Sequence, residues 1–495
     1  MNLKKKRSTQ TALIATATVI LLMIVSILIS ILPEGYLTAD VTSNKMYTLS
    51  DYTKQVLGDN EEKVELCLVS TGSAPNESIR NLLSKYDKIN KNISVRILYT
   101  DIDMDEIKEY TESPVSGSVI VRSGKRSVYL PYNSFFGYSR DAEAAAFFIY
   151  NVYYTEEYID CSYTEFKELY GESLGLYDGY CYENEITQAI RYCTSDSLKT
   201  VYLMSAGEGQ GFGYGLTDMI RDGMTEIKAF PADAQSIPDD ADAVMLTAYA
   251  DISSRNREML SDYAKNGGKI LLMSSGTSEK PELSALCEEM GIRLTGDTVF
   301  EDNENYRFGE YSALVIPDVN DEESGEKLSQ AGASVVMLGA TSVKISEDLS
   351  DGVEVQPILV TSPEAYTKSD ISNGFEFNEE QDKRGIHNLA VRAVNSAGGT
   401  LTVVSSAVYI NDDYDIYSDN GNKIFTVSLL RQLTNGVEAE EIPPVKSADQ
   451  TVYGNAAFKA SFVIMTVVFI SLTAYLFLRV KKQLFCGKKL NTSIG

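Results

Sequence analysis

The sequence predicts an α/β protein in which a thioredoxin-like domain and a second, parallel-sheet domain lie between two transmembrane helices. Three observations support this prediction: a long apolar run near each end, a β-α-β-α-β-β order of patterns in the first part, and alternating apolar strands and amphipathic helices in the second. The composition is that of a folded protein, with 44% hydrophobic and 23% charged residues among 495.

The two apolar runs predict the topology. Residues 12–32 follow four basic residues, and residues 460–478 precede a second basic segment. Each run is long enough to cross a bilayer core, which takes about 20 residues. The positive-inside rule places the basic ends, 1–11 and 479–495, in the cytoplasm, so we expect a two-pass plasma-membrane protein with a large extracytoplasmic domain. A cleaved signal peptide is the alternative for the first run, and it keeps the large domain on the same side.

The charge of the segment between the runs limits its partners. All 70 acidic residues lie there with 35 of the 44 basic residues, so the segment carries about −35 charges. Such a surface repels the phosphate backbone of nucleic acid and anionic lipid. Nucleic acid is therefore not expected as a partner, although solubility alone also accounts for the acidity.

The first domain is expected over residues 33–135. Its patterns predict a buried strand at 64–70, a helix at 77–89, a strand at 94–99, and a hairpin that turns at Ser123–Gly124–Lys125. This order is typical of a thioredoxin fold. The fold's redox chemistry needs a C-x-x-C motif after the first strand, where this chain has "TGSAPNES", so no redox role is expected.

The rest of the chain predicts a connector and a larger domain. Residues 136–198 are rich in tyrosine and predict a helical connector that either recognises a protein or sugar or packs against its neighbours. Residues 199–435 alternate buried strands with helices and predict a flavodoxin-like or amidotransferase-like parallel sheet. An irregular acidic insertion is expected at 291–397, and a linker at 436–459.

A glycine-rich loop follows the first strand of this larger domain, in "YLMSAGEGQGFGYGLTDMI". No register completes the G-x-G-x-x-G pattern of a dinucleotide loop, and the chain has no G-x-x-x-x-G-K-[ST] motif. No nucleotide cofactor is therefore expected, and any ATP dependence requires another subunit. Because open α/β sheets bind ligands at the carboxyl ends of strands, the candidate ligand-binding residues are Gly207, Glu208, Gly209 and Gly211. Glu208 could instead cap the following helix.

Catalytic and metal sites are not expected. The single histidine, His387, excludes a multi-histidine metal site, and only this residue could serve as the base for Ser274 or Ser275, which lack a complete G-x-S-x-G elbow. The acidic runs 101–106 and 411–422 do not match the calcium-loop register. We therefore expect no catalytic residue, no metal and no cofactor. A disulfide between the two cysteines at 161 and 181 is left open.

Several motifs together resemble one family, the membrane-anchored auxiliary proteins of ABC-type transport systems, which include the gliding-motility accessory subunit. The family's D-x-T-x-x-K-x-Y-T-L-S pattern matches "DVTSNKMYTLS", and its E-x-x-I-T-x-A-I pattern matches residues 183–190. The passages "YAKNGGKILLM" and "VVSSAVYINDD…GNKIF" also fit. Where the family tends to have G-H-G-E, this chain has "SAGE", so Ala206 replaces the histidine and cannot act in its place.

The resemblance implies a non-catalytic accessory subunit that works with a separate ABC permease and ATPase at the membrane. Its extracytoplasmic domain would act in recognition or coupling. A cell-surface protein that binds a glycan or another extracellular ligand is the alternative, supported by the tyrosines of the connector and the glycine-rich loop. A serine hydrolase that uses Ser274 or Ser275 with His387 is a third hypothesis.

Overall fold

The computed structural model describes most of the chain between its two ends. The described residues are 16, 20–21, 23, 48–72, 74–138, 140–156, 158–207, 216, 220–221, 223–232, 234–276, 278–372, 374–411, 417–437, 442–443 and 445–446. Contacts divide the chain into two compact units. One comprises Leu49–Pro444, and the other comprises Met1–Thr48 with Val445–Gly495, including the short strand β22 (Val445–Lys446).

The predicted transmembrane helices require a correction. Within the described part of the chain, no helix is both long and apolar enough to cross a bilayer. A span needs about 20 apolar residues in one helix. The prediction of a two-pass membrane protein with transmembrane helices is therefore wrong for these residues. The run 460–478 lies outside them, and only residues 16, 20–21 and 23 of the run 12–32 lie within them.

The first sheet has four strands in the order β2-β1-β3-β4. Strand β1 pairs in parallel with β2 and antiparallel with β3, which forms a hairpin with β4. The predicted strand at 64–70 and helix at 77–89 are both present with those bounds. The elements are α2 (Asp51–Asp59), β1 (Val64–Ser70), α3 (Glu77–Ile89), β2 (Ile93–Tyr99), α4 (Thr100–Ile107), β3 (Val119–Ser123), β4 (Ser127–Leu130) and the 3-10 helix η2 (Tyr132–Phe135).

Two of the motifs behind the family resemblance contact each other in this part of the fold. Ser50 caps α2 by accepting a hydrogen bond from Thr53 N, and its own amide donates to a carboxylate oxygen of Glu183 at 2.6 Å. The hydroxyl of Thr187 lies 3.0 Å from that of Thr53 and 2.9 Å from that of Tyr86. These motif residues thus join the start of the domain to a helix more than 130 positions later, which is a structural role.

The connector forms a helical hairpin and a third helix. Its elements are β5 (Phe136–Gly137), α5 (Arg140–Thr155), α6 (Tyr163–Leu174), β6 (Gly179–Tyr180) and α7 (Tyr182–Thr194). A capping box between Ser162 and Glu165 starts α6, and Gly175 ends it in the left-handed conformation. Ala146, Tyr163, Phe166 and Leu176 form a small core inside the hairpin. Helix α7 instead packs its apolar face into the core of the first sheet.

The larger domain is built on one extended sheet. Five strands are parallel and run in the order β8-β7-β9-β10-β21. Because the first strand in the sequence lies between the second and the third, the topological switch point falls between β7 and β9. The elements are β7 (Lys199–Ala206), β8 (Thr225–Ala229), β9 (Ala243–Ala248), α9 (Ser254–Lys265), β10 (Lys269–Ser274), α10 (Pro281–Glu289), β21 (Thr400–Val404), the 3-10 helix η3 (Val408–Ile410) and α13 (Gly421–Thr434).

The predicted parallel sheet also requires a correction, because the described residues form a mixed, 12-stranded sheet. The insertion continues the sheet through antiparallel strands, since β20 pairs antiparallel with β21 and covers what would otherwise be an open edge. Its elements are β11 (Ile292–Phe300), β12 (Arg307–Phe308), β13 (Tyr311–Val315), β14 (Asp318–Val319), α11 (Glu322–Ala331), β15 (Met337–Leu338), β16 (Thr341–Ile345), β17 (Glu354–Val360), β18 (Tyr366–Lys368), β19 (Lys383–Arg384) and β20 (Asn388–Val394).

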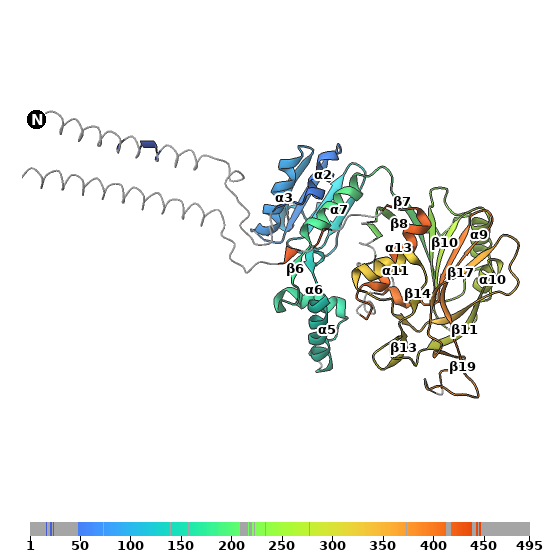
Figure 1. Cartoon of the computed structure of the whole chain (residues 1–495). Helices are drawn as coiled ribbons and strands as arrows, with labels where there is room; N and C mark the ends of the chain where they lie inside the picture. Colours follow the sequence, from blue (N-terminus) through green and yellow to red (C-terminus); the bar gives the residue numbers. More distant parts are fainter. Residues whose placement is uncertain are drawn as a thin grey trace, which may run out of the picture. The chain divides into compact units, whose positions relative to one another are not determined.

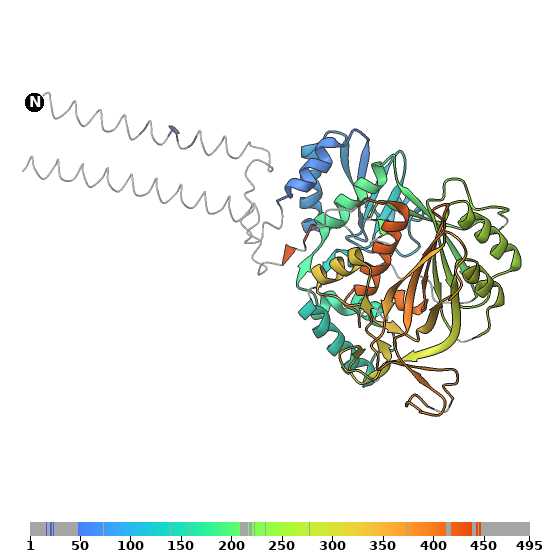
Figure 2. The ribbon, with the colours of Figure 1, turned by 45° about the vertical axis from the view of Figure 1, so that its right-hand side comes forward.

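Helices cover both faces of the parallel strands. Figure 1 shows α9 and α10 on one face and α11 and α13 on the other, and the turned view in Figure 2 shows the same layers. Leu260 of α9 and Leu286 of α10 belong to one core cluster, while Leu328 of α11 and Phe425 of α13 belong to the second. Because the helices cover both faces, a ligand could reach the sheet at the carboxyl ends of its parallel strands.

Candidate functional site

The first candidate lies at the switch point, where the glycine-rich loop leaves β7. Gly207 has a positive φ of +84°, and a Cβ atom there would lie 2.8 Å from Cβ of Ala250. The amides of Tyr249 and Ala250 both donate to the carbonyl oxygen of Ala206. Glycine is therefore needed at position 207 for backbone geometry and close packing.

The other predicted ligand-binding residues, Glu208, Gly209 and Gly211, lie outside the described residues. Their role stays a prediction, and so does the choice between ligand contact and helix capping for Glu208. The same holds for a ligand cleft formed by this loop.

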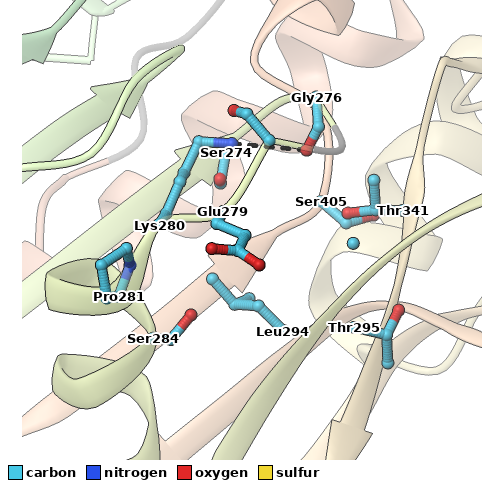
Figure 3. A pocket seen from close by; sticks show the side chains of 12 residues that line it. Ser274, Gly276, Glu279, Lys280, Pro281, Ser284, Leu294, Thr295, Thr341 and Ser405 are labelled. Carbon is cyan, nitrogen blue, oxygen red and sulfur yellow. Dashed lines mark hydrogen bonds between the residues drawn. The ribbon is translucent and has the colours of Figure 1, made fainter.

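A cavity of about 290 Å³ opens near the carboxyl ends of β10 and β21. Four separate parts of the domain line it: the segment from the end of β10 to the start of α10, the middle of β11, the start of β16, and the residue after β21. Figure 3 shows most of the lining side chains. The lining residues are Ser274, Gly276, Ser278, Glu279, Lys280, Pro281, Ser284, Leu294, Thr295, Gly296, Thr341 and Ser405. Sequence reasoning proposed a role only for Ser274 among them, and the residues of β11, β16 and the end of β21 come from segments far apart in the chain.

The charged groups of this cavity have different surroundings. Lys280 is only 6% exposed, and its ammonium donates to the carbonyl oxygens of Ser275 at 2.7 Å and Gly276 at 3.3 Å. Burial lowers the pKa of Lys280, and the Asp251 carboxylate opposes this shift. That carboxylate also accepts the amides of Glu282 and Leu283 at the start of α10. Glu279, by contrast, is exposed at the cavity.

Within the described residues, no hydrogen bond joins the two parts of the hypothetical hydrolase site. The Ser275 hydroxyl accepts a hydrogen bond from the amide of Ala407. His387 precedes β20, and its Nε2 is buried without a hydrogen-bond partner among those residues. Burial lowers the pKa of His387. The described lining of the cavity includes Ser274 but not His387.

The second candidate is the outer surface of the α5–α6 hairpin, which we call the hairpin face. Phe148 is 70% exposed, Tyr158 71% and Leu169 67%. Further exposed apolar residues of the same element are Val152, Tyr153, Tyr154, Tyr170 and Leu174. Scattered exposed apolar residues are ordinary, but a group of them on one two-helix element is a candidate interaction surface.

Acidic side chains border the hairpin face. The exposed acidic residues of this element are Glu156, Asp160, Glu165, Glu168 and Glu172. The Lys167 ammonium lies 4.9 Å from the ring centroid of Tyr138 and 4.7 Å from that of Tyr163, so aromatic rings hold this cation. Sequence reasoning found the tyrosine-rich segment, but it could not say which of its rings are buried.

The described cysteines are all free, so the Cys161–Cys181 disulfide that the sequence left open is not formed. Burial raises the pKa of Cys67, Cys193 and Cys287 to about 12. Among the described residues, no group of histidine, cysteine, aspartate and glutamate side chains could hold a metal ion. In the acidic run 101–106, Asp103 accepts the amide of Tyr99.

These cysteines give a first testable prediction. At pH 8 a maleimide should label Cys161 and Cys181 in the native protein and leave Cys67, Cys193 and Cys287 unlabelled. A thiol reacts only where the reagent can reach it and where its pKa is low enough for the thiolate to form at this pH. Labelling in denaturant should modify all six cysteines of the chain, and mass spectrometry of peptides identifies the sites. Rapid native labelling of Cys287 would contradict the described packing.

Comparison with protein families gives a match over part of the chain. Residues 43–133 match a family model described as a domain of unknown function (DUF7088). No curated protein sequence matches the chain. Among solved structures, the mmIFT52 N-terminal domain is similar at 17% identity and a TM-score of 0.36, covering 48% of this chain and 98% of that one.

Two further structures are similar at lower scores. One is a ThuA-like protein from Bacteroides uniformis, at 12% identity and a TM-score of 0.29, covering 48% of this chain and 93% of that one. The other is a cold-adapted β-galactosidase from Rahnella sp. R3, at 11% identity and a TM-score of 0.28, covering 51% of this chain and 33% of that one. Such low scores carry no conclusion about activity.

Proposed function

We propose that this chain is a non-catalytic accessory subunit that works with a separate ABC permease and ATPase, and that the hairpin face is the surface that binds a protein partner. The observation that supports this proposal is the exposure of Phe148, Tyr158 and Leu169 on one helical hairpin. Desolvation of large aromatic and aliphatic side chains is the main source of affinity in protein interfaces.

The construction of the hairpin supports a binding role. Its inner side chains, including Phe166 at 0% exposure, hold the two helices together. The ring of Phe147 also packs edge-on against Tyr417, which follows η3, at 6.1 Å between centroids. The outer side chains therefore project from a fixed support, which lowers the entropy lost on binding.

The acidic border indicates the chemistry of the partner surface. An apolar patch with carboxylates around it is complementary to an apolar patch bordered by lysine or arginine. Charges at such a rim mainly set the rate of association and its salt dependence, whereas the apolar centre sets the lifetime of the complex. The resemblance to auxiliary proteins of ABC-type systems suggests the permease or its ATPase as the partner.

Co-purification tests this proposal. The tagged full-length chain, expressed in its native host, should retain a permease and an ATPase. A double variant, Phe148→Asp with Leu169→Asp, should retain them at least about tenfold less, because each lost anchor removes about 1–2 kcal/mol or more. Tyr311→Asp is the matched control, since Tyr311 on β13 is also 66% exposed. Retention of neither protein by the wild type, or equal retention by the double variant, would count against the proposal.

A further inference from the structure

The cavity near β10 contains an unsatisfied hydroxyl at its inner side. Ser405 follows β21 and is 1% exposed, and its Oγ has no hydrogen-bond partner among the described residues. The main chain around it is fully engaged, because its amide donates to the carbonyl oxygen of Leu389 and its carbonyl oxygen accepts from the amide of Thr341. A buried hydroxyl without a partner is costly, so it indicates a position where a bound molecule could complete the bonding.

Other hydroxyls surround the same space. Ser274, Ser278, Ser284 and Thr341 line it with Ser405, while the hydroxyl of Thr295 donates to the carbonyl oxygen of Ser342. Figure 3 shows Ser405 and Thr341 close together, across the space from the carboxylate of Glu279. Hydroxyl groups both donate and accept hydrogen bonds, whereas the ionised carboxylate only accepts. The lining therefore matches a ligand that offers donors and acceptors in several directions.

The charges disfavour an anionic ligand. Lys280 lines the cavity, but its ammonium already donates to two backbone carbonyl oxygens, and the Asp251 carboxylate interacts with it electrostatically. The start of α10, which could otherwise attract an anion, is occupied by the same Asp251 carboxylate. An anion would in addition approach Glu279. A cation would approach the ammonium of Lys280 in a buried setting, so an uncharged ligand fits both groups best.

We infer that this cavity is a binding site for a small, uncharged polyhydroxylated molecule of about the size of one sugar ring or cyclitol. At the mouth of the cavity, Glu279 accepts hydrogen bonds from the hydroxyl groups of the ligand. At the inner end, the hydroxyl groups of Ser405 and Thr341 form hydrogen bonds with the ligand. The volume of about 290 Å³ lies near the lower limit of small-molecule pockets, which begin at about 300 Å³. This site is separate from the hairpin face and does not depend on the proposed function.

The test is titration calorimetry of the purified full-length chain with a fixed panel of probes. The neutral probes are glycerol, myo-inositol, D-glucose, D-galactose and D-mannose, and the charged counterparts are D-glucuronate and D-glucosamine. At least one cyclic neutral probe should bind, and it should bind at least about tenfold more tightly than either charged counterpart. No binding by any neutral probe, or tighter binding of a charged one, would overturn the inference.

Variants separate a binding role from a structural one. Ser405→Ala should weaken the best probe about threefold to tenfold, as expected for one hydrogen bond, and Glu279→Gln should weaken it about tenfold or more. Neither should lower the melting temperature of the free protein, because neither side chain has a bond to lose among the described contacts. Ser396→Ala is the control and should bind normally, because Ser396 lines a separate cavity of about 220 Å³ with residues of α9 and α10 such as Ser261 and Leu286. Unchanged binding in both Ser405→Ala and Glu279→Gln would refute the site.

Discussion

Replacing Gly399 by alanine should destabilise the larger domain by about 3 kcal/mol or more. Gly399 lies just before β21, and a Cβ atom there would overlap the carbonyl oxygen of Ala264 and approach Nδ2 of Asn395 to 2.8 Å. Ala264 O is a backbone atom near the end of α9, and it accepts hydrogen bonds from Asn395 Nδ2 and the amide of Gly267. This oxygen cannot move aside unless the end of α9 moves with it. Overpacking of this kind lowers the free energy of unfolding by about 1–3 kcal/mol or more.

Chemical denaturation of the full-length chain measures this effect. Gly58→Ala is the matched control, because Gly58 lies in α2 and nothing would lie within 4 Å of its new Cβ atom. Alanine is favoured over glycine in a helix by up to about 1 kcal/mol, so the control should be unchanged or more stable. Equal midpoints for Gly399→Ala and the wild type would show that α9 and β21 do not meet as described.

Replacing Lys368 by methionine should cost about 3–5 kcal/mol, the largest effect that we expect from a single charge. Lys368 and Asp382 form an ion pair at 2.7 Å, with side chains only 7% and 5% exposed. The ammonium also donates to the carbonyl oxygen of Glu376. Removal of one partner leaves the other charge buried without compensation, which is the expensive case for ion pairs. Lys54→Met is the control, because its partner Asp51 is fully exposed, and it should cost less than about 1 kcal/mol.

The same pair predicts a pH dependence. Burial acts to raise the pKa of Asp382, but the hydrogen bonds from Lys368 and from the amide of Asn378, together with the charge of Lys368, outweigh it, and the pKa in the folded protein lies below its ordinary value. A carboxyl group whose pKa is lower in the folded than in the unfolded protein stabilises the fold. This stabilisation is complete at pH values above the unfolded-state pKa, about 3.9, and is lost as the pH falls through the lower pKa of the folded state. The stability difference between the wild type and Lys368→Met should therefore shrink as the pH drops below about 4. A difference that stays constant from pH 7 to pH 3 would contradict the ion pair.

Much of the secondary structure could be predicted from periodicity alone. The strand at 64–70 and the helix at 77–89 have the predicted bounds, because each shows the apolar pattern that its core face requires. The antiparallel extension of the sheet was missed. Its strands pair with residues distant in sequence, as β16 does with β20, and such pairing leaves no local signal.

The candidate sites, too, could be predicted from the sequence only in part. The tyrosine-rich segment was visible in the sequence, but the exposure of Phe148 depends on which helix face packs inward. The cavity was not visible, because Lys280 and Ser405 are 125 positions apart and a lysine is ordinarily expected on the surface. Ser50 and Glu183 were singled out by family resemblance, and their contact could not have been deduced from composition or spacing.

Site-specific photocrosslinking at the hairpin face tests the central claim most directly. A photoreactive phenylalanine analogue replaces Phe148 in the full-length chain, and the same analogue replaces Tyr311 as a control of matched exposure. After irradiation in the native host, position 148 should form an adduct with a permease or ATPase subunit of an ABC transporter, and position 311 should not. If position 148 gives no such adduct while the chain is folded and abundant, or if position 311 gives the same adduct in equal yield, the hairpin face is not the partner surface.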